Sequence, residues 1–137
     1  MSNLLVQNIK HTNNTTSMSI NSSGQVSVRG ESSATTTNLQ QGLAKLWANV
    51  DGTGTSAMDD SFNASTHTDI GTGEFSVTTT NPFNSSDHSA HVSGNSSHVF
   101  LNNTNLTTTN IRLGITGSGN SLQDCDPITF TSHGDLA

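Results

Sequence analysis

Three histidines lie close together in the second half of the sequence, at positions 88, 91 and 98, and imidazole is a common zinc ligand. A protein zinc site needs about four nitrogen, sulfur or oxygen ligands. On a strand, His88 and His91 point to opposite faces because their separation is odd. A trimer can bring one histidine from each chain to its axis, but the spacing favours histidines on surfaces and loops. We therefore expect no metal site.

Acidic residues occur in two short clusters, Asp59-Asp60 and Asp124-Cys125-Asp126. Calcium takes about six to eight oxygen ligands, and the second cluster has the alternate spacing that some calcium loops use. It lacks the glycine and the distal glutamate of an EF-hand loop, so the pattern favours solvated acidic turns. The single cysteine has no partner for an intrachain disulfide or a CxxC motif, which predicts a free thiol made in a reducing compartment.

Serine, histidine and aspartate are abundant, yet none of them forms a hydrolase motif. The sequence has no Gly-x-Ser-x-Gly elbow, and Gly117-Ser118-Gly119 is too short to be one. Gly71-Thr72-Gly73 is not a phosphate loop, because no lysine follows and a strand is expected next. The large β-helices of glycan-cleaving fibres, with their paired carboxylates, do not fit into 137 residues. The prediction is a non-enzymatic protein without a cofactor.

Composition excludes two further classes of partner. The net charge is −6, whereas a nucleic-acid-binding protein needs a basic patch. No run approaches the roughly 20 apolar residues of a membrane span. The N-terminus does not have the pattern of a secretory signal, so we expect synthesis in a cytoplasm and no glycosylation. The only cations are four scattered residues: Lys10, Arg29, Lys45 and Arg112.

The chain is poor in apolar residues. Only 29% of it is hydrophobic, while 58 of the 137 residues are threonine, serine or asparagine. Threonine suits strands, and asparagine, serine and glycine suit turns, so this composition favours many short, polar-faced strands. The core of a single chain should be weak. Burial of surface between copies would then stabilise the fold, which predicts self-association.

The first 43 residues contain the pattern of a small hairpin. A strand is expected over residues 4–10, and residues 16–20 and 25–29 should pair across a turn that ends in Gly24. A linker over residues 30–37 and a short helix over residues 38–43 follow. We call residues 1–43 the arm, because a hairpin of this size is marginal alone in water and needs another surface.

Residues 44–137, called the body here, contain runs of alternating apolar and polar residues, which are typical of antiparallel strands. Leu46, Ala48 and Val50 alternate with polar residues and Trp47, and Phe75 and Val77 do so further on. Two glycine-threonine turns and a bridging segment separate these two runs. Further strands are expected over residues 88–93, 98–102, 106–115 and 128–132. The predicted fold is all-β, with an N-terminal β-hairpin arm followed by an antiparallel β-sandwich or jelly-roll-like body.

Three sequence motifs of the body are similar to motifs of a known protein family. They are W-x-N-x-D-G-T-G-T from Trp47, S-F-N-x-S from Ser61 and T-D-x-G-T-G-x-F-x-V from Thr68. Together they resemble a module in fibre-like virion proteins of tailed bacteriophages, marine phages especially, in which an aromatic and a valine follow the threonine-aspartate turn. Residues 6–26 are similar to a second element of those proteins. The resemblance covers roughly half of the chain and does not extend beyond Pro82.

This resemblance implies a virion structural protein, synthesised in the host cytoplasm and forming a homotrimeric tail or head fibre. Its implied partners are copies of itself, other tail or capsid proteins and, for a fibre that contacts the host, a surface glycan, without nucleic acid or membrane insertion. Two alternatives remain: a capsid decoration (cement) protein without receptor binding, and a carbohydrate-binding adhesin module.

Apolar residues of the arm and the single tryptophan are the candidate contacts for assembly or attachment. Trp47 has two interpretations: it fills the core between the sheets, or it lies in a subunit interface, where aromatic residues often contribute much of the binding energy. The complete set of candidates is Leu5, Val6, Ile9, Met18, Ile20, Val26 and Trp47.

Overall fold

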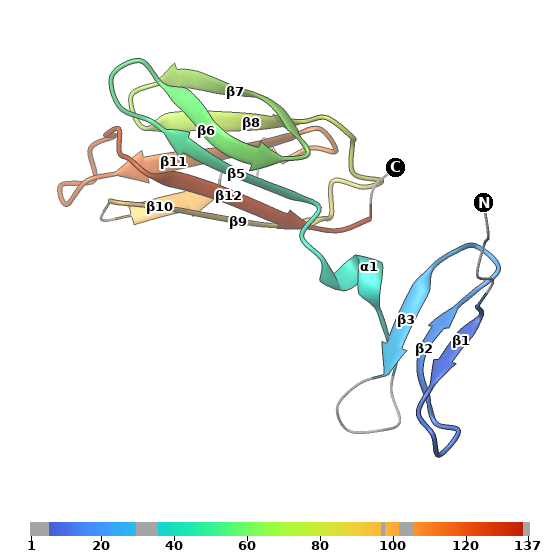
Figure 1. Ribbon diagram of the computed structural model, residues 1–137. Helices are drawn as coiled ribbons and strands as arrows, with labels where there is room; N and C mark the ends of the chain where they lie inside the picture. The colour runs from blue at the N-terminus through green and yellow to red at the C-terminus, as the bar shows by residue number, and fades with distance from the viewer. Residues whose placement is uncertain (1–5, 30–35, 97, 102–105, 136–137) are drawn as a thin grey trace. The chain divides into compact units, whose positions relative to one another are not determined.

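The computed structural model describes residues 6–29, 36–96, 98–101 and 106–135 (Figure 1). The chain divides into two compact units, Met1–Leu43 and Ala44–Ala137. Both consist of antiparallel sheets, which confirms the all-β prediction. Among the described residues, no helix is long and apolar enough to cross a lipid bilayer.

The arm is a single four-stranded sheet with the strand order β1-β2-β3-β4. One helical turn follows directly after β4 and lies near the end of the sheet at β3. β4 covers the end of the segment expected to be a linker and the first residue expected in the helix, and sequence reasoning missed it because its three residues carry no apolar alternation. The elements are β1 (Asn8–Lys10), β2 (Thr16–Ile20), β3 (Val26–Arg29), β4 (Thr36–Asn38) and α1 (Leu39–Gly42).

The hairpin of the arm has the predicted pairing. Met18 lies opposite Val28 and Ile20 opposite Val26. Asn21 closes the turn, since its Oδ1 atom accepts hydrogen bonds from the backbone nitrogens of Ser23 and Gln25, each at 3.0 Å.

The body is a sandwich of two four-stranded antiparallel sheets, with the orders β6-β5-β12-β9 and β10-β11-β8-β7 (Figure 1). The first and last strands of the body, β5 and β12, are neighbours in the middle of one sheet. The strands are β5 (Leu46–Asp51), β6 (Ala57–Phe62), β7 (Ala64–Gly71), β8 (Glu74–Thr79), β9 (Ser89–Gly94), β10 (His98–Leu101), β11 (Asn110–Thr116) and β12 (Ile128–His133).

The bridging segment between the two glycine-threonine turns is in fact two strands, β6 and β7. Both are edge strands and bury little, so their sequences show no clear alternation of apolar and polar residues. A bulge near Asn49 in the pairing of β5 with β6 disturbs the period further.

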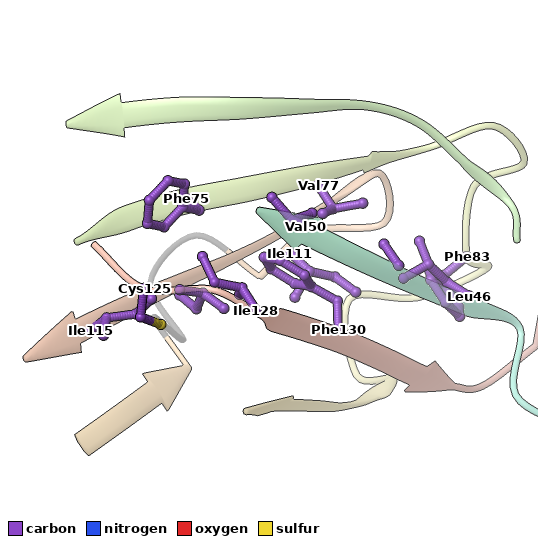
Figure 2. Packing of buried hydrophobic residues seen from close by; sticks show 12 residues of the cluster. Leu46, Val50, Phe75, Val77, Phe83, Ile111, Ile115, Cys125, Ile128 and Phe130 are labelled. Atoms are coloured by element: carbon purple, nitrogen blue, oxygen red, sulfur yellow. The ribbon is translucent and has the colours of Figure 1, made fainter. Parts of the chain in front are cut away.

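The core lies between the two sheets of the body, as Figure 2 shows. It is built from the inward-facing residues of the alternating runs, together with one loop phenylalanine and the cysteine. Its members are Leu46, Ala48, Val50, Phe75, Val77, Phe83, Ile111, Leu113, Ile115, Cys125, Ile128 and Phe130.

Candidate interaction surfaces

The first glycine-threonine turn packs closely against the core of the body. Gly52 is buried, and its nitrogen donates to the carbonyl oxygen of Cys125 at 3.1 Å. A Cβ atom at this position would lie 2.5 Å from Cδ1 of Ile128 and 2.9 Å from Cζ of Phe75. Only glycine lets the turn approach so closely. On the turn surface, Oδ1 of Asp51 accepts hydrogen bonds from the nitrogen and the hydroxyl of Thr53, and these bonds lower the pKa of Asp51.

The second turn docks onto the same segment of the chain. Gly73 has a left-handed backbone with a φ of 70°, and its nitrogen donates to Oδ1 of Asp124 at 2.7 Å. The nitrogen of Ile115 donates to the Gly73 carbonyl at 2.7 Å. Both turns therefore hold residues 123–125 in place. Asp124, considered above as a calcium ligand, acts in this structure as a hydrogen-bond acceptor for the turn.

His88 is a buried structural residue. Its Nδ1 atom lies 2.7 Å from Oγ of Ser132, and its Nε2 atom donates to the carbonyl oxygen of Thr107 at 3.0 Å. The ring stacks on Phe83 with 3.9 Å between the centroids. Ser132 is fully buried and donates to the carbonyl oxygen of Ser89. Both side chains are buried, and the pair ties β12 to the segments before β9 and β11.

The other candidate metal ligands that the structure describes do not form a cluster. Within the described ranges, no group of three or more histidine, cysteine, aspartate and glutamate side chains is placed to hold a metal ion. His91 and His133 meet edge to face with 6.4 Å between their ring centroids. Burial raises the pKa of the Cys125 thiol, and the two flanking carboxylates act in the same direction.

The arm has one apolar face and one polar face. We call the apolar side, formed by Ile9, Met18, Ile20, Val26 and Val28, the arm face; the register aligns Ile9, Met18 and Val28 in one row and Ile20 with Val26 beside it. The opposite side carries polar residues, with Asn8, Ser19, Ser27 and Asn38 in one row and Arg29 opposite Thr36 beside it.

Four of the seven candidate residues named from the sequence thus share the arm face. Val6 lies at its edge and lines a shallow hollow with Gln7 and Ile20. Leu5 lies outside the described residues. Val28, which was not named, joins the face because it pairs with Met18.

Trp47 is not part of the core, so that interpretation was wrong. The indole lies on the outer side of β5 and is 39% exposed. Its register partner on β6 is Phe62, which is 52% exposed. Sequence reasoning missed Phe62 as a neighbour of Trp47 because β6 was not predicted.

Two register rows cross this outer side, which we call the aromatic face. The first row contains Phe62, Trp47, Thr131 and His91, and the second contains Asp60, Asn49, Thr129 and Ser93. In the second row the hydroxyls of Ser93 and Thr129 are hydrogen-bonded at 2.6 Å. Oδ1 of Asn49 is buried and has no hydrogen-bond partner among the described residues.

Comparison of the chain with protein-family models, with curated proteins and with solved structures finds no match.

Proposed function

We propose that this protein is a non-enzymatic structural subunit of a phage virion, a homotrimeric tail or head fibre that assembles through its arm and displays its body. The observation that supports this proposal most is the arm face. It is an apolar side of a single-layered sheet, and none of the arm side chains that the structure describes is buried. The resemblance of residues 6–26 and of the body motifs to phage fibre proteins supplies the virion setting.

The physical argument concerns the stability of the arm. Ordering the backbone costs about 1–2 kcal/mol per residue, and burial of apolar surface has to offset that cost. A four-stranded sheet whose apolar side has no second layer buries little of that apolar surface. The apolar residues of the sheet gather on one side, which indicates that this side meets another surface, and equivalent arm faces of other copies offer matching chemistry.

The test is the molar mass of the purified full-length chain, measured by light scattering behind a sizing column. We expect the mass of three chains, and we expect Met18→Asp to give the mass of one chain because a carboxylate in an apolar interface is costly. Ser27→Asp is the matched control, since it places the same charge on the polar side of the same sheet and should keep the trimer.

The unfolding transition of the body serves as the folding control for all three proteins. A wild-type chain that stays monomeric at every concentration, with both units folded, would contradict the assembly proposal. The virion setting has its own test, which is labelling of phage particles with an antibody against the body and electron microscopy. Absence of label from particles of a phage that encodes the chain would contradict it.

A further inference from the structure

The two aromatic residues of the aromatic face, Trp47 and Phe62, are exposed at directly opposite positions of β5 and β6. Phe100, on the outer side of the other sheet, provides the contrast. Its ring lies where a Cβ atom of Gly114 would be, so it covers a glycine in the neighbouring strand. No glycine of the described chain has Trp47 or Phe62 among its near neighbours. An exposed pair of large aromatic rings on adjacent strands marks an interaction site.

The surroundings of the pair indicate the chemistry of the partner. Apart from Asp60, the remaining positions of the two rows carry hydroxyl, amide and imidazole groups, which donate and accept hydrogen bonds. Asp60 is the only carboxylate in the rows, and neither row contains lysine or arginine. A polyanion therefore finds no basic patch here.

We propose that the aromatic face binds a neutral hexose oligosaccharide. The C–H bonds on one face of a sugar ring carry partial positive charge and pack against the negative face of an aromatic ring. Adjacent strands lie about 4.8 Å apart, so two linked sugars can contact Trp47 and Phe62 together. The hydroxyls of the sugar then reach Thr131, His91 and Ser93. This binding extends the proposed function but requires only the folded body, so either proposal can fail alone.

The chain contains one tryptophan and no tyrosine, so its tryptophan fluorescence reports on Trp47 alone. Full-length protein is titrated with cellohexaose, maltohexaose and mannohexaose, and with a galacturonate hexamer as the anionic comparison. We expect a saturable blue shift with at least one neutral hexamer and none with the anionic one. Phe62→Leu should weaken that binding about tenfold or more, as truncation of an aromatic anchor does.

Phe100→Leu is the matched control, since it makes the same exchange at an exposed site of the other sheet and keeps a side chain over Gly114. It should bind within about twofold of the wild type. Trp47→Leu, followed by calorimetry because it lacks the fluorophore, should bind no hexamer. The unfolding transition of each variant shows that its body is folded.

Three outcomes would overturn the proposal. The first is that no neutral hexamer changes the emission of the wild type, and the second is that only the anionic hexamer does. The third is that the emission depends on protein concentration without sugar and that Phe62→Leu removes this dependence, since the aromatic face would then be an interface between copies.

Discussion

The arm and the body share one sequence pattern but differ in what covers their apolar residues. In both, apolar and polar residues alternate along short antiparallel strands. In the body, two sheets turn their apolar sides toward each other, and 12 hydrophobic residues are buried between them. In the arm there is one sheet, and the arm face has no second layer among the described residues. Alternation therefore predicts which side of a sheet is apolar, but not what covers that side.

The largest contrast between the two units should come from deletion of an apolar side chain in each. Phe75 is fully buried in the body, and Phe75→Ala should lower the free energy of unfolding by about 3–5 kcal/mol, because it leaves a cavity. Met18→Ala should leave the unfolding transition of the body unchanged and weaken self-association. Urea unfolding and light scattering measure the two effects. A loss below about 1 kcal/mol for Phe75→Ala would contradict the described core.

A second comparison uses one glycine from each unit. Gly52→Ala should destabilise the body by about 1–3 kcal/mol, because the new methyl group meets Ile128 and Phe75. Gly24 has a φ of 77° and open space around it, so Gly24→Ala should strain only the turn of the arm, by about 1 kcal/mol. Thermal unfolding of the body should distinguish them. Equal effects on the body transition would show that the two units do not unfold separately.

A smaller effect, of opposite sign, is expected at Thr79. Its side chain is buried in the body, and Oγ1 has no hydrogen-bond partner among the described residues. Thr79→Val keeps the shape and removes the unpaired hydroxyl, so it should raise the stability of the body by about 1 kcal/mol. Thr66→Val, at an exposed position of β7, is the control and should change little. A destabilised Thr79→Val protein would mean that the hydroxyl has a partner in solution.

The smallest effect concerns Asp51 and pH. The hydrogen bonds from Thr53 lower the pKa of Asp51 in the folded body, so its carboxylate stabilises the fold above the unfolded pKa of about 4. That contribution is lost as the pH falls through the lowered pKa of the folded state. Asp51→Asn should therefore be slightly less stable than wild type at pH 7 and equal to it at the acid end of a urea series. Asp59→Asn controls for net charge, and a difference that persists in acid would refute the assignment.

The fold was predictable from the sequence where a strand buries one side. Leu46, Ala48 and Val50 in β5 and Ile111, Leu113 and Ile115 in β11 alternate because they line the core. The edge strands β6 and β7 bury few side chains, and the short β4 contains no apolar residue. The hydropathy pattern therefore does not reveal these three strands. The two glycine-threonine turns were recognisable as turns, but their common contact with residues 123–125 was not, because it joins segments far apart in the chain.

The candidate surfaces were predictable only in part. Four of the apolar arm residues named from the sequence share the arm face, and their role in assembly stays a prediction. The sequence could not tell whether Trp47 faces the core. Alternation shows that Trp47 and Leu46 lie on opposite sides of β5, but it does not show which side faces the core. The outer position becomes clear only once Leu46 and Ala48 are seen buried. Phe62 could not be joined to Trp47 without the register of β6.

The pairing of β5 with β12 has a consequence for the order of folding. About 80 residues of sequence separate β5 and β12, which are neighbours in the middle of their sheet. The middle of this sheet therefore cannot form before the last strand of the body is present. Such long-range pairing is slow and becomes possible only when the ribosome has delivered residues 128–133. The arm pairs between close neighbours in sequence and emerges first. Under the proposed assembly through the arm face, copies synthesised on one messenger RNA would meet through their arms while their bodies are still incomplete.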